Sequence, residues 1–136
     1  MKFRNEFAFL SNMFPCRIVY KDYVFNNAEA FFQACKDGAS AHKFVGIDGF
    51  TAKRLGRTVK LRPDWNNIRT RVMKRVLVEK FRQNPNLMAK LKSVKGPIVE
   101  DNDWNDTFWG RCRGVGRNEL GKILEEIREI ETGFEH

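Results

Sequence analysis

At 136 residues, 42% of them hydrophobic, the chain has the length of one domain and enough apolar side chains for a core, so disorder is not expected. Lys and Arg outnumber Asp and Glu by 25 to 17, and the charge of +8 favours anionic partners such as phosphates or nucleic acid. Because the apolar runs are short and the N-terminal segment lacks the apolar core of a signal peptide, we expect a cytoplasmic protein with no membrane partner.

Cysteine and histidine are too few and too scattered for the common metal and redox frameworks. Cys16, Cys35 and Cys112 form no Cys-x-x-Cys pair, which argues against a disulfide framework and a structural zinc site. His42 and His136 cannot supply a metal cluster or a Ser-His pair. Any chemistry is therefore expected to use carboxylates, lysines or hydroxyls, with neither a metal nor a cofactor.

The first predicted element is a short β-hairpin. Two β-rich runs, Cys16–Tyr20 and Tyr23–Phe25, are separated by two turn residues. A helix is expected next, with Asn26 or Asn27 as its N-cap and Gly38 as its end.

The middle of the chain is predicted to be helical in pieces. Residues from Ser40 to Leu55 form a broken helical region, which is interrupted by glycines and closed at Gly56. The strongest helix prediction runs from about Asp64, a potential cap, to Arg82. Its apolar stripe consists of Trp65, Ile68, Val72, Val76 and Phe81.

The last third of the chain alternates between regular and irregular segments. A helix is expected to start at Asn84-Pro85, and Ile98-Val99 to return as a strand. Residues Glu100–Arg117 form a polar loop without helical period, and Asn118 is expected to cap a final amphipathic helix. That helix carries Leu120, Ile123, Leu124, Ile127 and Ile130.

Three polar residues share one face of the helix that follows the hairpin. At about 100° per residue, Gln33 lies about 40° from Glu29, and Lys36 about 20° to the other side. Glu29 also has capping-box spacing from Asn26, and a lysine in the last turn complements the helix dipole. Capping leaves Gln33 unexplained, so the trio is either a capped, solvated edge or a site.

The polar loop contains two incomplete motifs. Its oxygen-rich start at Asp101 resembles a calcium loop, but Asp106 stands where Gly is needed and Cys112 where Glu is needed. The segment Gly114-x-Gly116-x-x-Glu119 falls short of a dinucleotide fingerprint and follows no βαβ unit. The glycines are either an ordinary loop or a phosphate site formed with Arg111, Arg113 and Arg117.

Tryptophans stand close to acidic residues in two places. Trp104 and Trp109 lie on either side of Asp106, and Trp65 follows Asp64. A tryptophan is more often a core residue than a binding platform. An exposed indole beside a carboxylate would suit a nucleobase or a nicotinamide, because stacking accepts any planar ring.

Taken in order, these segments resemble the NADAR or YbiA-like family, which is named for NAD and ADP-ribose processing. The similarity runs from Phe9 to about Arg128. Family members often have His directly after the glutamate, where this chain has Ala30, so any role of that His is absent or supplied otherwise. The matching segments are Phe9-Leu-Ser-Asn12, Phe14-Pro15, Glu29-x-x-x-Gln33-x-x-Lys36, Leu55-Gly-Arg57, Asp64-Trp65, Met73, Lys80-Phe81, Val99-Glu100, Asp106-x-x-Trp109-Gly110 and Gly116-x-Asn118-x-Leu120-Gly121.

The resemblance implies a YbiA-like fold and an N-glycosidase that cleaves the bond between ribose C1 and a base nitrogen. We therefore expect residues 1–136 to form a single compact α+β domain, mainly helical with a small β-hairpin or sheet. Family activities include removal of ADP-ribose from guanine in nucleic acid and hydrolysis of a phosphorylated ribosylamino-pyrimidine intermediate of riboflavin synthesis. We expect the first activity, on DNA or RNA, because the basic charge suits a polyanion. The second activity and a noncatalytic ADP-ribose or nucleic-acid binding module are the alternatives.

The resemblance also implies which residues act on a substrate that contains ADP-ribose or ribosyl phosphate. Glu29 would stabilise positive charge at C1 or align water, Lys36 would capture C1 as a Schiff base, and Asp106 would move protons. Trp109 is expected against the base and Arg57 at phosphate. The full substrate-binding set is Phe9, Ser11, Asn12, Gln33, Arg57, Trp65, Trp109, Gly110 and Asn118.

Overall fold

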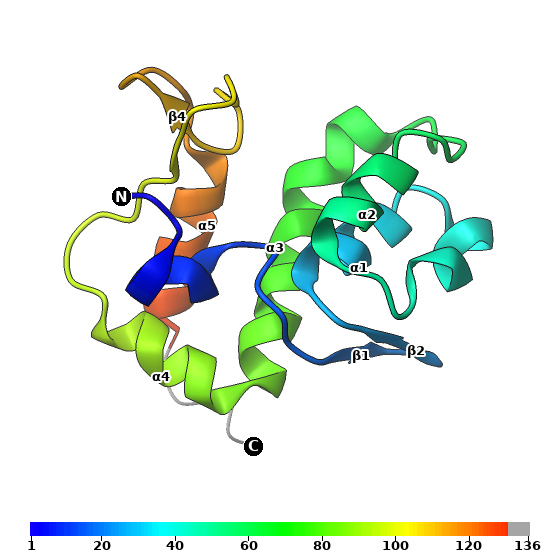
Figure 1. Ribbon diagram of the computed structural model, residues 1–136, viewed down its shortest axis with the longest axis horizontal. Coiled ribbons are helices and arrows are strands. Elements are labelled where there is room, and N and C mark those ends of the chain that lie inside the picture. The colour runs from blue at the N-terminus through cyan, green and yellow to red at the C-terminus, as the bar shows by residue number, and fades with distance from the viewer. Residues whose placement is uncertain (131–136) are drawn as a thin grey trace. The chain divides into compact units, whose positions relative to one another are not determined.

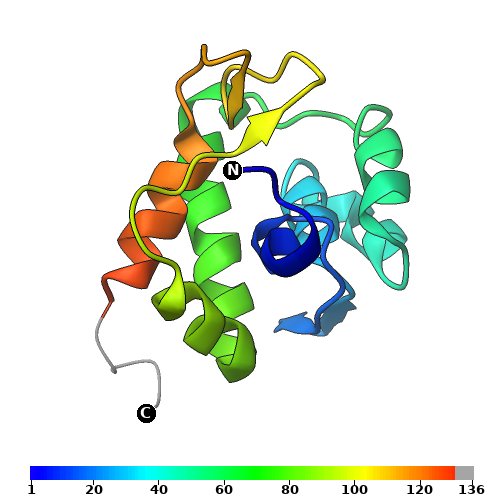
Figure 2. The same ribbon diagram turned by 60° about the vertical axis from the view of Figure 1, so that its left-hand side comes forward.

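The computed structural model describes residues 1–130 and is of the α+β class, mainly helical with small β elements, as the sequence predicted (Figures 1 and 2). The chain divides into two structural units. One consists of Asn12–Asn84, and the other joins Met1–Ser11 to the chain from Pro85 onward. That the chain forms a single domain stays a prediction, and His136 lies outside the described residues.

The predicted β-hairpin is confirmed in the unit Asn12–Asn84. Strands β1 (Ile18–Tyr20) and β2 (Tyr23–Phe25) pair antiparallel, with Ile18 opposite Phe25. The Phe25 ring stacks on Phe31 of the following helix at a centroid distance of 5.0 Å. Burial of these aromatic rings fixes the hairpin against that helix.

Helix α1 (Ala28–Ala34) begins one residue later than a capping box would require. Its N-cap is Asn27, whose side chain accepts a hydrogen bond from Ala30 N at 2.7 Å. The capping-box interpretation with Asn26 is therefore wrong, because Glu29 becomes the second helical residue. All seven residues of α1 are buried, so the helix is a core element.

The predicted end of α1 at Gly38 is also wrong. The helix ends at Ala34, because Asp37 is already the N-cap of the 3₁₀ helix η2 (Gly38–Phe44). Lys36 consequently lies beyond the helix and not in its last turn. As the residue directly after the C-cap Cys35, it still lies at the C-terminal end of the helix dipole.

The broken helical region is confirmed as two pieces that both contact α1. Gly46, with φ of 76°, separates η2 from α2 (Gly49–Leu55). The Asp48 carboxylate caps α2 by accepting a hydrogen bond from Thr51 N at 2.7 Å. The helix ends before Gly56, as predicted.

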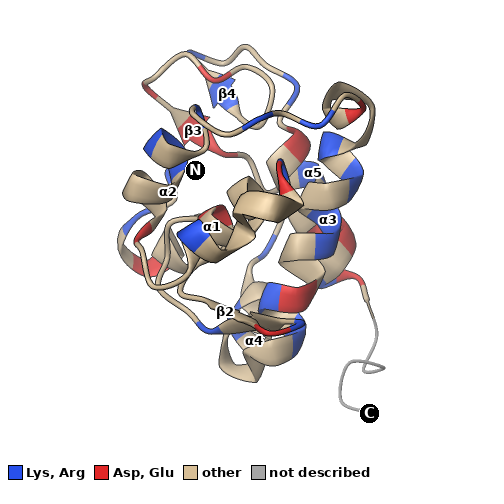
Figure 3. Ribbon diagram, turned by 90° about the vertical axis from the view of Figure 1, so that its right-hand side faces the viewer, with Lys and Arg blue, Asp and Glu red and all other residues tan. Residues whose placement is uncertain are grey.

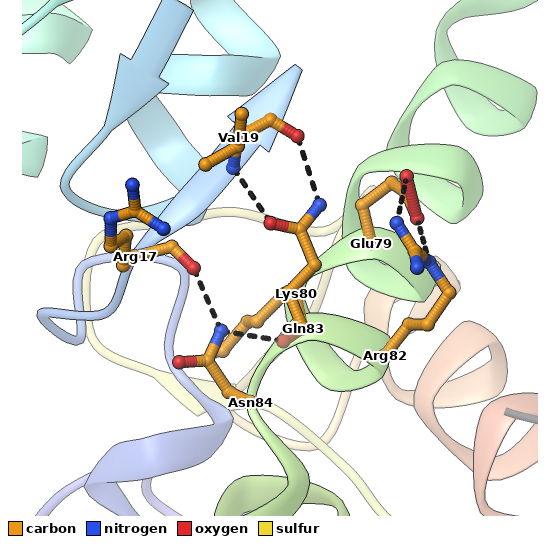
Figure 4. A network of polar contacts seen from close by, with 7 residues as sticks. All are labelled: Arg17, Val19, Glu79, Lys80, Arg82, Gln83 and Asn84. Atoms are coloured by element: carbon orange, nitrogen blue, oxygen red, sulfur yellow. Dashed lines mark hydrogen bonds and ion pairs between the residues drawn. The ribbon is translucent and has the colours of Figure 1, made fainter. Parts of the chain in front are cut away.

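Helix α3 (Trp65–Gln83) confirms the strongest helix prediction, but Asp64 is not a side-chain cap. Its carboxylate instead pairs with Arg62 at 2.7 Å. Figure 4 shows how the other end of α3 meets the hairpin. The Gln83 amide accepts from Val19 N at 2.8 Å and donates to Val19 O at 2.9 Å, so it replaces a strand partner at the edge of β1.

In the other unit, helices α4 (Pro85–Ser93) and α5 (Glu119–Arg128) contact each other. Strand β3 (Asp101–Asn102) pairs parallel with β4 (Arg111–Cys112). Figures 1 and 2 place this pair at the N-terminal end of α5. The unit also contains the 3₁₀ helix η1 (Asn5–Leu10).

The predicted strand at Ile98-Val99 is wrong, because side chains take up the backbone groups of Ile98. Its N–H donates to Glu125 Oε2 at 2.8 Å, and its carbonyl accepts from Asn118 Nδ2 at 2.9 Å. Asn118 precedes α5 as predicted, but it has φ of 55° and makes no capping hydrogen bond. Its Oδ1 instead accepts from Glu100 N at 3.0 Å, so Asn118 clamps the segment that leads to β3.

Of the five apolar residues predicted for the final helix, four are buried in α5, and the fifth, Ile130, lies beyond its end. Those four are Leu120, Ile123, Leu124 and Ile127. Within residues 1–130, no helix is long and apolar enough to cross a membrane.

Candidate functional site

Glu29 and Gln33 form a buried polar pair on α1. Gln33 Nε2 donates to Glu29 Oε2 at 3.3 Å, one helical turn away. The two residues are only 8% and 6% exposed. The pair therefore lies inside the unit and is not the solvated helix edge that the sequence left open.

Two buried amide oxygens in this unit have no hydrogen-bond partner among the described residues. They are Gln33 Oε1 and Asn12 Oδ1. The backbone places both near α1, because Asn12 O accepts from Glu29 N at 3.0 Å. A buried acceptor without a donor is costly, so these oxygens are positions at which a ligand hydroxyl or N–H would gain a hydrogen bond.

Gly56 determines how closely α2 approaches Gln33. A Cβ atom at this glycine would overlap Gln33 Oε1 and lie 3.2 Å from Ala52 O. The sequence indicated Gly56 as a helix stop and as part of the family segment Leu55-Gly-Arg57, but no local signal indicated its contact with Gln33.

Lys36 lies just past α1, half-buried and under the influence of two charges. Burial lowers the pKa of the Lys36 amine, the Glu29 carboxylate opposes this shift, and the Arg57 guanidinium adds to it. Its carbonyl accepts from Arg62 N at 3.0 Å, which holds the segment after α1. A lowered pKa increases the fraction of neutral, nucleophilic amine, so the shift has the direction that covalent chemistry at Lys36 requires.

The other predicted binding residues of this unit differ in exposure. Arg57 is exposed, whereas Trp65 is buried and packs on Phe32 of α1 with ring centroids 5.1 Å apart. Trp65 thus has the surroundings of a core residue, and its contact with substrate stays a prediction.

Asp106 organises a turn in the second unit. Its Oδ1 accepts from Phe108 N at 3.0 Å and Trp109 N at 2.9 Å. Asn102 holds the same residue, since its Nδ2 donates to Asp106 O at 2.9 Å and its Oδ1 accepts from Asp106 N at 3.1 Å. The Trp109 indole meets Phe108 edge to face at 4.7 Å.

These hydrogen bonds give Asp106 a positioning role for Trp109 through the backbone. Sequence reasoning missed Asn102, the residue that holds the Asp106 backbone. The proton-transfer role assigned to Asp106 stays a prediction.

Backbone hydrogen bonds hold the segments around Gly110 and Asn118 together. Asn118 N donates to Gly110 O at 3.2 Å, and Arg111 N donates to Glu100 O at 2.8 Å. Glu100 also accepts a hydrogen bond from Asn102 Nδ2 at 3.1 Å. Both predicted binding residues thus support the loop, and their contact with substrate stays a prediction.

Phe9 and Ser11 lie at the end of η1. Phe9 is buried, and Lys90 Nζ lies 5.9 Å from its ring centroid. Ser11 follows the helix, and its N–H donates to Ala8 O at 3.0 Å.

The predicted site residues divide between the two structural units. The unit Asn12–Asn84 holds Asn12, Glu29, Gln33, Lys36, Arg57 and Trp65. The other unit holds Phe9, Ser11, Asp106, Trp109, Gly110 and Asn118. The structure brings Glu29, Gln33 and Lys36 together, and a common site for both groups stays a prediction.

The polar loop Glu100–Arg117 carries the residues of the calcium and phosphate interpretations. Within residues 1–130, no group of three or more His, Cys, Asp and Glu side chains could hold a metal ion. Of the three arginines near the glycines, Arg117 pairs with Glu119 at 2.8 Å and Arg113 Nη2 donates to Asn105 Oδ1 at 2.7 Å. The phosphate-site interpretation of this loop stays a prediction.

Comparison with known proteins tests the family resemblance. The NADAR domain family matches residues 2–130. N-glycosidase YbiA of Escherichia coli is 36% identical over 131 residues, which cover 92% of this chain and 82% of that protein. The NMR structure of E. coli YbiA superimposes with a TM-score of 0.81 at 29% sequence identity, over 95% of this chain and 82% of that one.

A further relative carries this region within a longer chain. Riboflavin biosynthesis protein VVA0006 of Vibrio vulnificus is 36% identical over 128 residues, 90% of this chain. This chain spans only 35% of that protein. The family resemblance is thus confirmed by the family match, the curated relatives and the fold: the chain belongs to the NADAR domain family.

Proposed function

We propose that the chain is an N-glycosidase that removes ADP-ribose from modified guanine in DNA or RNA, without a metal or cofactor. The observation that supports this proposal most directly is the buried Glu29–Gln33 pair. The Glu29 carboxylate also influences the pKa of Lys36. Relatives named N-glycosidases support hydrolysis at an N-glycosidic bond. The charge of +8 and the basic residues that recur along α3 favour a polyanionic substrate (Figure 3).

Glu29 and Lys36 supply complementary chemistry at ribose C1. Loss of the base leaves positive charge on C1, which the Glu29 carboxylate stabilises. If the ribose ring opens, the neutral Lys36 amine adds to C1, and the base leaves with a proton that Asp106 supplies. Water then adds to the lysine imine, which frees the Lys36 amine and leaves an aldehyde at C1. Addition of the ribose ring hydroxyl to this aldehyde closes the ring again and gives the C1 hydroxyl. The balance is one water consumed, one C–N bond broken and one free base released.

The binding residues hold the substrate around that carbon. Trp109 lies against the base, and the exposed Arg57 takes a phosphate. The unpartnered oxygens of Gln33 and Asn12 accept from ribose hydroxyls. Phe9, Ser11, Trp65, Gly110 and Asn118 complete the proposed binding set.

A base-release assay tests this function. Purified protein is incubated with ADP-ribosylated guanine DNA in the presence of EDTA, and free ADP-ribose is measured by chromatography. Wild type is expected to release it, and Glu29→Gln to lose at least about a hundredfold in rate while retaining substrate affinity. Glu6→Gln, which changes an exposed carboxylate of η1, is the matched control and should keep the wild-type rate.

The proposal fails if wild type leaves the substrate intact after long incubation. Binding without turnover would then identify a noncatalytic ADP-ribose or nucleic-acid module.

The covalent step has its own test. Borohydride reduction during turnover should add the mass of the sugar adduct to the peptide that contains Lys36 in wild type, and no mass in Lys36→Arg. Turnover without any trapped adduct would assign direct hydrolysis to Glu29 and a positioning role to Lys36.

A second candidate substrate is the phosphorylated ribosylamino-pyrimidine intermediate of riboflavin synthesis. The similarity to VVA0006 and to the maize riboflavin biosynthesis protein PYRR favours it, since each match covers 90% of this chain. A parallel assay with that compound decides between the two, because the true substrate should have a kcat/KM at least about a hundredfold higher.

A further inference from the structure

A tight turn after β4 carries exposed side chains that the proposed reaction does not use. Cys112 N donates to Val115 O at 2.9 Å, and Val115 N donates to Cys112 O at 3.1 Å. The two residues between them, Arg113 and Gly114, have φ of 51° and 77°. Two positive φ values in this position are typical of a type I′ turn, which is a rigid tip.

A second loop is hydrogen-bonded to this turn. Asn105, with φ of 65°, accepts from Arg113 Nη2 at 2.7 Å and from Cys112 Sγ at 3.8 Å. The neighbouring Trp104 is 61% exposed, and Val115 is 66% exposed. An indole, an aliphatic side chain and a guanidinium are thus held in two adjoining loops of one unit.

Three basic side chains act on Asp103, which precedes Trp104. The pKa of Asp103 is lowered mainly by a hydrogen bond from Lys2. The positive charges of Lys2, Arg4 and Arg113 lower it further. Asp103 is paired with Lys2 at 2.6 Å, and the more distant charges that act on it belong to the exposed Arg4 and Arg113. Arg4 and Arg113 thus provide two exposed guanidinium groups on this side of Asp103, a group type that binds phosphate oxygens.

These features together fit one class of ligand. An exposed indole stacks on any base, and nearby arginines bind the phosphates that flank it. A purely apolar partner would not require the arginines, and a free phosphate would not require the indole.

We propose that Trp104, Arg113 and Val115, with Arg4 beside them, form a stacking platform for a nucleobase of single-stranded nucleic acid. The platform would contact the strand next to the modified base. The contact with the strand next to the modified base rests on the proposed function, whereas binding of unmodified nucleic acid does not.

The first experiment measures binding of unmodified, fluorescently labelled single-stranded DNA by anisotropy, as a function of salt. Trp104→Ala is expected to weaken binding about tenfold, and Trp104→Phe to retain most of the affinity because it keeps a stacking ring. Arg113→Gln should reduce the slope of log affinity against log salt by about one. Phe50→Ala is the matched control, since Phe50 is an aromatic residue of α2 with a similar exposure of 64%.

The second experiment compares release of ADP-ribose from a modified oligonucleotide and from a modified mononucleoside. Trp104→Ala should lower kcat/KM for the oligonucleotide about tenfold relative to that for the mononucleoside. Absence of release from both substrates with wild type would sink the proposed function but leave the binding result standing.

Three outcomes would overturn the platform itself. They are equal DNA affinity of Trp104→Ala and Phe50→Ala, an unchanged salt slope in Arg113→Gln, and concentration-dependent self-association that Trp104→Ala abolishes. The last outcome would assign the exposed indole to contact with a second copy of the chain.

Discussion

The Gln33 side chain donates to the carboxylate of Glu29 at 3.3 Å, and both residues are buried on α1. Gln33 uses its Nε2 for this bond, while its Oε1 has no partner among the described residues. The amide thus orients the carboxylate and offers an acceptor at the same point. This relationship links the packing of α1 to the chemistry proposed for it.

Gly56→Ala is expected to disturb this pair. The added Cβ overlaps Gln33 Oε1, so the amide must rotate or α2 must shift. We expect a loss of about 1–3 kcal/mol in the free energy of unfolding, measured with urea, and a base-release rate at least about tenfold lower. Gly38→Ala is the control, because nothing lies within 4 Å of a Cβ at that glycine. Equal effects of the two substitutions would refute the importance of this contact.

Removal of the Arg57 charge should change the pH dependence of the reaction. Arg57 helps to lower the pKa of Lys36, so Arg57→Gln is expected to raise that pKa. If the neutral amine is the nucleophile, kcat at saturating substrate increases with pH through the Lys36 pKa, and the ascending limb moves to higher pH in the variant. Arg54→Gln, an exposed arginine of α2, should leave the limb in place. If the ascending limb does not move in Arg57→Gln, the group whose ionisation controls kcat is not Lys36.

Asp106 can be tested for its two roles separately. Asp106→Asn keeps an oxygen that accepts the backbone N–H groups of Phe108 and Trp109, whereas Asp106→Ala removes it. If Asp106 only positions the turn, Asp106→Asn should keep activity within about threefold and Asp106→Ala should lose about tenfold or more. If it also moves protons, both variants should lose about a hundredfold. Near-ultraviolet circular dichroism of the tryptophans reports whether the turn persists in each variant.

Lys80 should make the stability of the chain depend on alkaline pH. It is fully buried in α3, and burial lowers its pKa from 10.5 to about 8, with Cys16 opposing the shift. Between these values an unfolded chain keeps the Lys80 proton that the folded chain has lost, so the contribution of this group to the free energy of unfolding should rise with pH, by up to about 3 kcal/mol. The raised pKa values of Cys16 and of Cys35, the latter about 11, act in the opposite direction, so the rise is measured as the difference between wild type and variant. Lys80→Met should lack this rise, whereas Lys60→Met, at an exposed position, should retain it. Urea denaturation at pH 7.5 and pH 10 measures the difference, and parallel changes in Lys80→Met and wild type would contradict the assignment.

Elements with a strong local signal were predictable from the sequence. The alternation of β-rich runs around Lys21-Asp22 predicted the hairpin, and the apolar period from Trp65 predicted α3. The family followed from an ordered set of short motifs, and the match over residues 2–130 confirms it. These signals depend on residues a few positions apart, and the sequence contains them completely.

Caps and clamps were not predictable, because they depend on partners far along the chain. Asn118 has the sequence position of an N-cap, but the backbone of Ile98 and Glu100, about 20 residues earlier, offers its side chain better partners. The sequence offered Asn26 and Asn27 as N-caps of α1 and did not decide between them; Asn27 is the cap, and Glu29 N is held by the carbonyl of Asn12.

The sequence by itself determined the helix and hairpin segments, the family and the choice of Glu29, Gln33 and Lys36 as a group. Only the tertiary structure decided that Glu29 and Gln33 are buried, that Lys36 lies beyond α1, and that Gly56 contacts Gln33. The physical reason is that periodicity specifies a helical face, whereas burial and hydrogen-bond partners depend on what packs against that face.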